Sequence, residues 1–180
     1  MLSSHVNSVT WQNFGLLIAY LIPGFIAVNG VAFQSSRAAG WLGGLGHGSG
    51  PTVGGFLFLT IAAVFAGLIA STFRWMLIDR ILHATGIRRP DWDFRQLNPN
   101  LPAFQTLIEI HYRSYQFYAN SMVAMYFYAA MRWNRNGFNL SEAAIVMVLG
   151  TVLLLGARDT LWNYYRRVDG FLAKRANSSD

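Results

Sequence analysis

Four long apolar runs constrain this chain more than any other feature. Each is 18 to 20 residues long, and together they contain a single charged residue, Glu142. An α-helix rises about 1.5 Å per residue, so each run can cross the hydrocarbon core of a bilayer, which is roughly 30 Å thick. The runs are Phe14–Phe33, Gly54–Phe73, Ser114–Met131 and Phe138–Ala157.

Composition also favours lipid as the surrounding medium. Of the 180 residues, 53% are hydrophobic and 12% charged, whereas a soluble domain carries about 25% charged residues. A soluble all-α protein is the alternative, and four separate runs of spanning length argue against it. We therefore predict an all-α integral membrane protein with one domain: a bundle of four transmembrane helices with a kinked first span and a cytoplasmic C-terminal helix. The predicted spans lie at about 14–33, 54–82, 105–132 and 140–158, and an amphipathic tail at 159–175.

The basic residues predict how the chain is threaded. Four spans place both termini on the same side as the connection between the second and third runs. That side carries eleven of the 14 Lys and Arg residues, so the positive-inside rule predicts a multi-pass protein of the cell membrane with both termini cytoplasmic. The first run is expected to be retained, because no basic residue precedes it and it exceeds the about 7–15 residues of a signal peptide.

Two motifs predict how the first two helices pack. Ala63, Gly67 and Ser71 are spaced at i, i+4 and i+8, and small residues at this spacing let helix backbones approach closely. The partner helix could belong to this chain or to another. Pro23 and Gly24 lie at the centre of the first run, where proline removes a backbone hydrogen bond and predicts a kink. This pair is either a hinge or an ordinary packing kink.

A polar stripe is predicted on the third helix. Glu109, Arg113, Gln116 and Asn120 fall on one helix face, and Glu109 and Arg113 have the spacing of an ion pair. Polar groups within a bilayer must face the protein interior or an oligomer interface. We interpret the stripe as polar packing between helices. An ion path, a ligand site and a catalytic role are the alternatives.

The cytoplasmic segments carry cations next to aromatic residues. Asp91 and Asp93 could hold a divalent metal, but two acids balancing neighbouring arginines is the simpler interpretation, so no metal and no cofactor is predicted. The fourth helix is expected to be capped by Ser141. Its tail is expected to present a stripe of Trp162, Tyr165, Val168 and Leu172 to the membrane surface or to a partner. Contact with anionic lipid head groups is predicted for Arg88, Arg89, Arg95, Arg166 and Arg167.

Recognisable catalytic motifs are lacking. The sequence contains no cysteine, and its four histidines are scattered; there is no His-Glu-x-x-His metalloprotease motif. The excess of positive charge is attributed to lipid head groups rather than to nucleic acid. We predict a non-enzymatic inner-membrane protein that acts through assembly, as a homo-oligomer or as an accessory subunit of a membrane complex. One alternative is an ion channel or small-solute transporter lined by the polar stripe. The other is a lipid-phosphate enzyme that uses Asp91, Asp93, Arg88, Arg89 and His111.

Overall fold

The described part of the chain is entirely helical in its regular elements. The computed structural model describes residues 4–43, 53–92 and 97–172, and the side chains of 4–14, 16, 97–100 and 171 lie outside this description. Within these ranges the predicted all-α fold is confirmed. The elements are α1 (Ser4–Ala32), α2 (Ser36–Gly43), α3 (Val53–Phe73), η1 (Arg74–Ile78), α4 (Asp79–Ala84), α5 (Leu97–Leu107), η3 (Ile108–Tyr112), α6 (Arg113–Asn136) and α7 (Leu140–Leu172).

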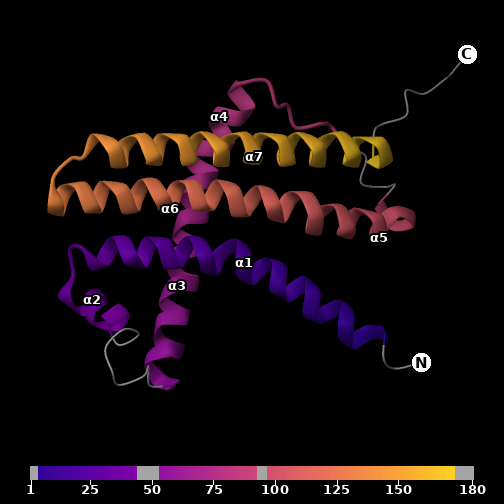
Figure 1. Ribbon diagram of the computed structural model, residues 1–180. Coiled ribbons are helices and arrows are strands. Elements are labelled where there is room, and N and C mark those ends of the chain that lie inside the picture. Colours follow the sequence, from indigo (N-terminus) through magenta and orange to yellow (C-terminus); the bar gives the residue numbers. More distant parts are fainter. Residues whose placement is uncertain (1–3, 44–52, 93–96, 173–180) are drawn as a thin grey trace, which may run out of the picture.

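Three helices form a layer, and a fourth crosses it. Figure 1 shows α1, α6 and α7 side by side with α6 in the middle, while α3 runs across them. α6 contacts both α1 and α7, and α3 contacts α1 and α6. At the far end of the crossing helix, Leu82 and Ile87 are buried against Tyr115 of α6 and Leu161 of α7. The continuous helix formed by α3, η1 and α4 therefore contacts α1, α6 and α7 in turn.

The contact between α1 and α3 is made by backbone against backbone. A Cβ atom on Gly24 would overlap the carbonyl oxygen of Ala63, and a Cβ atom on Gly67 would overlap the carbonyl oxygen of Tyr20. Ala63 is completely buried here, while Ser71 is only half-buried. Small residues allow such an approach because the main-chain atoms themselves form the packing surface. The stripe of small residues thus has a partner helix within the chain, and Gly24 lies at that contact.

A tight turn joins α6 to α7. Gly137 has a φ of 84° and follows α6 directly, as expected for a glycine at a helix C-terminus. Arg132 and Glu142 form a two-pronged ion pair across the turn, with N–O distances of 2.8 and 2.5 Å. The predicted cap is wrong by two residues. Asn139 caps α7, because its Oδ1 accepts hydrogen bonds from the backbone N–H of Ser141 and of Glu142.

Two π-helical turns extend the second and third long helices. η1 joins α3 to α4, so the second helix continues past its apolar run to Ala84, and Gly86 follows with a φ of 101°. The sequence predicted this extension. The third helix begins earlier than the span predicted at about 105–132, because α5 starts at Leu97. Pro99 lies in its first turn, where no backbone N–H has a helical partner.

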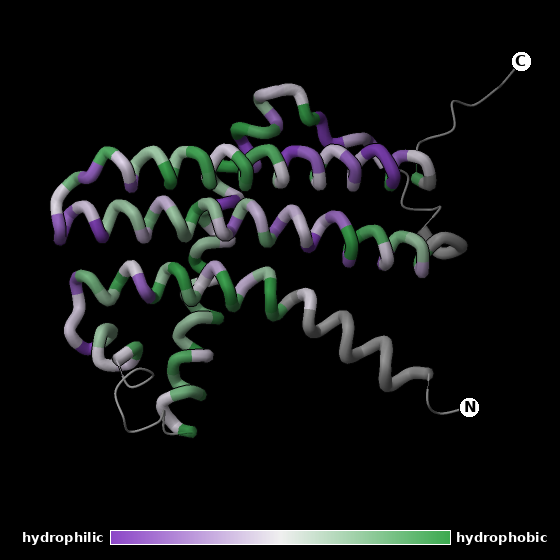
Figure 2. The backbone as a smooth tube through the Cα atoms, in the orientation of Figure 1, coloured by the Kyte–Doolittle hydropathy of each residue, from purple (hydrophilic) through white to green (hydrophobic). Residues whose placement is uncertain are grey.

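Two helices in the described ranges are long and apolar enough to cross a membrane. They are Val53–Ala84 and Leu140–Gly170, and only 22% and 11% of the residues in their apolar windows are buried. The core helix of a soluble protein would be mostly buried, so this exposure indicates association with a membrane. Within the described residues, the apolar part of α1 is Leu17–Ala32. Figure 2 shows hydrophobic residues along α3 and the first half of α7, with hydrophilic residues gathered in the second half of α7.

Gly67→Ala is expected to destabilise the fold by about 1–3 kcal/mol, because its methyl group overlaps the Tyr20 carbonyl and overpacking carries a penalty of this size. Gly54→Ala is the matched control in the same helix, since a Cβ there meets no atom within 4 Å. Thermal unfolding of both variants in detergent measures the difference. Equal melting temperatures for the two variants would contradict a backbone contact at Gly67.

Candidate functional site

A buried polar cluster lies where the crossing helix meets α6. Arg74, the first residue of η1, is only 5% exposed, and Tyr115 of α6 is 1% exposed. The Tyr115 hydroxyl donates a hydrogen bond to Oδ1 of Asp79, and Nε of Arg74 lies 4.0 Å from the same oxygen. The guanidinium carbon of Arg74 is 5.2 Å from the centre of the Tyr115 ring. The three side chains therefore form one charge-balanced group between two helices.

The π-helical turn η1 creates this arrangement. In an α-helix, residues five apart point in different directions, but π-helical bonding joins residue i to residue i+5. The backbone N–H of Asp79 donates to the carbonyl of Arg74 in this way, so the two side chains share a face. A second π-helical turn, η3, immediately precedes α6, and there the N–H of Arg113 donates to the carbonyl of Ile108. Such turns are frequent at functional sites.

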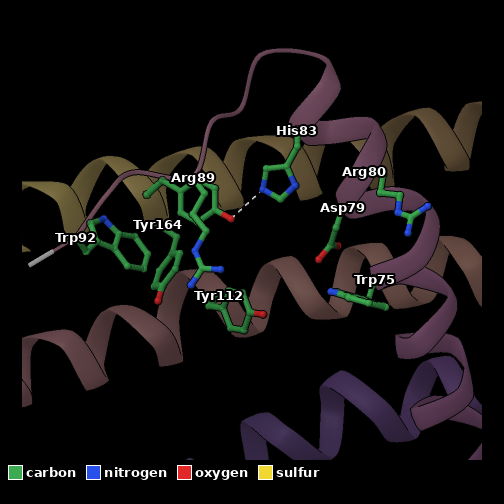
Figure 3. A pocket seen from close by; sticks show the side chains of 9 residues that line it. Trp75, Asp79, Arg80, His83, Arg89, Trp92, Tyr112 and Tyr164 are labelled. Atoms are coloured by element: carbon green, nitrogen blue, oxygen red, sulfur yellow. Dashed lines mark hydrogen bonds between the residues drawn. The ribbon is translucent and has the colours of Figure 1, made fainter. Parts of the chain in front are cut away.

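A cavity of about 360 Å³ opens beside this cluster. Figure 3 shows the side chain of Arg89 extending from the loop after α4 toward Tyr112 and Tyr164, with Asp79 and Trp75 on the other side. His83 Nε2 and the Tyr165 hydroxyl are 3.2 Å apart, which joins α4 to α7. The lining comes from four segments of the chain: Trp75, Asp79, Arg80, His83, Arg89, Trp92, Tyr112, Tyr164 and Tyr165.

The cavity combines aromatic walls with a positive charge. The guanidinium carbon of Arg89 lies 6.0 Å from the centre of the Trp92 ring, and Arg80 and Arg89 are both exposed. Burial raises the pKa of Tyr164 to about 12 and also raises the pKa of Tyr165, so both hydroxyls keep their protons near neutral pH. Because Arg74 balances Asp79, the remaining charge of the lining is that of the two exposed arginines. This arrangement suits an anionic group with apolar surroundings.

The polar stripe of α6 meets α1. Asn120 is completely buried, and its Nδ2 donates to the carbonyl oxygen of Ala19 over 3.0 Å. Pro23 has no N–H, so the Ala19 carbonyl has no donor from its own helix, and Asn120 supplies the missing hydrogen bond. Gln116 Nε2 donates to the Tyr20 hydroxyl at 3.3 Å. Two residues of the predicted polar stripe, Gln116 and Asn120, therefore contact the turn of α1 that precedes Pro23.

The two remaining members of the stripe differ from this pair. Arg113 lies against α1, because a Cβ on Gly15 would be 3.1 Å from its Nη1. Glu109 is half-buried and belongs to η3. The single-face prediction assumed an unbroken α-helix from Glu109 onward, and the π-helical turn changes the rotation between Glu109 and the other three residues.

The predicted head-group cations lie at different places. Arg88, Arg89, Arg166 and Arg167 are exposed, and of these Arg89 lines the cavity. Arg95 and Asp93 lie outside the described residues. His111 and Asp91, proposed with them for a lipid-phosphate enzyme, are not among the residues that line the cavity. Within the described ranges no group of three or more His, Asp and Glu residues could hold a metal.

The predicted face of the C-terminal tail is only partly right. Val168 and Leu172 are buried, but with Tyr164 rather than Trp162, which is 49% exposed. These buried residues pack against Leu107 of α5, with Phe104 and Ile108 beside it. The tail is the continuous end of α7, and it covers a helix of its own chain on this face.

Comparisons with protein-family models, with curated proteins and with solved structures find no match. Geometry and charge therefore carry the functional inference. Sequence patterns gave no reason to single out Arg74, Asp79 and Tyr115, because their spacing fits neither an α-helical pair nor a motif. The one available signal in the sequence was an arginine, Arg74, directly after an apolar run, because a charged residue at that place needs a partner or the head groups.

Asn120→Ala is expected to lower the free energy of unfolding by about 1 kcal/mol, because the Ala19 carbonyl then has no donor. In a Pro23→Ala background the effect should shrink, since an alanine at that position can supply a backbone N–H to the same carbonyl. Chemical unfolding of the four proteins in detergent measures this coupling. Asn29→Ala is the control, because its amide donates to Phe25 of the same helix. An Asn120→Ala effect of the same size in both backgrounds would contradict the proposed role of Pro23.

Asp79→Ala is expected to destabilise the fold by about 3 kcal/mol, because it leaves the buried Arg74 without its counter-charge. Replacing both residues by leucine should restore much of this loss, since no charge then remains buried. Asp159→Ala, which removes an exposed carboxylate bonded to Asn163, is the control. Thermal unfolding in detergent compares the variants, and a double variant less stable than Asp79→Ala alone would argue against the pair.

Proposed function

We propose that this chain is a multi-pass protein of the cytoplasmic membrane that acts by assembling with other membrane components, as a homo-oligomer or as an accessory subunit. The observation that carries the proposal is that its two membrane-length helices turn most of their apolar residues outward. On α3, Ile61 and Phe65 are 60% and 65% exposed, and on α7, Val148 and Val152 are 64% and 60% exposed. Apolar surface of this extent requires lipid or another protein to cover it.

A concave apolar surface supports assembly. A groove of about 380 Å³ lies between α1, α3 and α6, and its walls include Val31, Phe73, Leu77 and Phe127. Packing of side chains is the main source of affinity between membrane helices, since lipid tails are as apolar as leucine. A groove offers more contact to an incoming helix than a flat face does.

Charge supports the proposed orientation. The two stretches assigned to the cytoplasmic side, residues 74–113 and 158–180, together carry eleven of the 14 basic residues. The positive-inside rule then favours cytoplasmic termini. In this proposal α1, α3, α6 and α7 all cross the bilayer, with α3 inclined to the other three.

The geometry favours packing over conduction for the polar stripe. A channel lined by this stripe needs its side chains to face an open path. Arg113, Gln116 and Asn120 instead lie against α1. A polar line whose amide groups donate hydrogen bonds within one chain stabilises the fold, and it leaves the outer faces apolar for partners.

Single-cysteine variants test the membrane placement, because the sequence has no native cysteine. Arg88→Cys should react with a membrane-impermeant maleimide only after the cells are opened, and Arg135→Cys should react in intact cells. Val148→Cys should react in neither case, because hydrocarbon shields it. Labelling of Arg88→Cys in intact cells would overturn the orientation, and ready labelling of Val148→Cys would overturn the span.

The same approach tests assembly. Ile145→Cys, on the outer face of α7 and 60% exposed, should give disulfide-linked dimers or cross-links to a second protein in native membranes. Ala119→Cys is the matched control, since Ala119 is completely buried in the chain. A purified protein with the mass of one chain, together with no cross-linked product at Ile145, would overturn the assembly proposal.

A further inference from the structure

We propose that the cavity beside Arg89 binds the phosphate head group of one anionic phospholipid molecule. This inference rests on the proposed membrane function and adds a defined lipid site to it. It differs from a general attraction of surface arginines to lipid, because it assigns the binding to one cavity with named contacts. The depth of the cavity, its charge and its side-chain donors all favour such a ligand.

The depth of the cavity matches the head-group level of a bilayer. Three apolar runs end next to it: Gly54–Phe73 just before Trp75, Ser114–Met131 just after Tyr112, and Phe138–Ala157 two turns before Tyr164. All three ends belong to the side that the basic residues assign to the cytoplasm. Tryptophan and tyrosine are enriched at this level, because their rings are partly apolar and partly polar. A ligand here meets lipid before it meets free solutes.

The charge of the cavity selects an anion. Among the residues that the structure describes, no carboxylate forms an ion pair with Arg80 or Arg89. The one carboxylate of the lining, Asp79, lies beside the buried Arg74 and accepts a hydrogen bond from Tyr115. The positive charge of Arg89, which extends into the cavity, therefore remains for a ligand, and Arg80 adds positive charge at the edge. A guanidinium group matches the oxygens of a phosphate with two parallel N–H donors.

The remaining contacts suit a phosphate ester. The raised pKa of Tyr164, caused by burial, keeps its hydroxyl protonated as a donor. His83 Nε2 lies 3.2 Å from the Tyr165 hydroxyl, which adds a second polar contact to the lining. Trp75, which is 63% exposed, offers a ring face to the glycerol and first methylene groups of a lipid.

Native mass spectrometry of the full chain in mild detergent tests the site. After removal of bound lipid, the protein is titrated with phosphatidylglycerol, and one bound molecule is expected per chain. Arg80→Gln plus Arg89→Gln should weaken binding at least about tenfold, since each arginine supplies charged hydrogen bonds. Arg166→Gln plus Arg167→Gln is the matched control. It removes the same charge from exposed residues of α7 that do not line the cavity, and it should bind like the unchanged chain.

Three results would overturn the proposal. Equal weakening in both double variants would mean general surface attraction. Equal binding of phosphatidylcholine, which carries no net charge, would mean that the cavity does not select an anion. Displacement of the lipid by millimolar inorganic phosphate would assign the site to a soluble phosphate compound. Failure of the membrane proposal is recognised separately, because the chain would then remain in solution without detergent.

Arg89→Lys, which keeps the charge but loses the two-pronged donor, should bind with intermediate strength.

Discussion

The hydrogen bond between Asn120 and the Ala19 carbonyl is the contact on which the arrangement of the layer depends. Pro23 removes the donor that this carbonyl would find in its own helix, and a buried carbonyl left without a hydrogen bond destabilises the fold by about 1 kcal/mol. Asn120 supplies the donor from α6, which fixes both the rotation and the height of α6 against α1. Gly24, the residue after Pro23, has no side chain and admits α3 on another face of α1. Two adjacent residues thus determine which helices surround α1.

The second constraint is where the chain places charge. Arg74 follows directly after an apolar run, where a charged group must find a partner or reach the head groups. The π-helical turn η1 aligns it with Asp79, at the expense of regular α-helical bonding. The same turn brings Trp75 and Asp79 to the wall of the cavity. The pairing of Arg74 with Asp79 and the placement of Trp75 and Asp79 at the cavity wall therefore both follow from one local change in helical winding, the π-helical turn η1.

Sequence patterns predicted the parts of the fold that depend on one helix at a time. The apolar runs predicted the helices, and the span predicted at about 54–82 anticipated that the second helix continues past its apolar run. The small residues predicted a close helix contact, but a stripe on one helix cannot say which helix it meets or at what angle. The π-helical turns were missed because a period of 3.6 was assumed throughout. The cavity could not be predicted, because its lining comes from four segments that only tertiary packing brings together.

The buried cluster also determines what the cavity can bind. An anion placed beside Asp79 would be repelled if that carboxylate carried an unbalanced charge, and the two exposed arginines would then be partly cancelled. Arg74 does not line the cavity, yet its position 4.0 Å from Asp79 removes this repulsion. Tyr115 donates a hydrogen bond from α6 to the same carboxylate, so Asp79 is both balanced by Arg74 of its own helix and joined to α6. Packing at the crossing and affinity for an anionic head group are in this way linked through a single carboxylate.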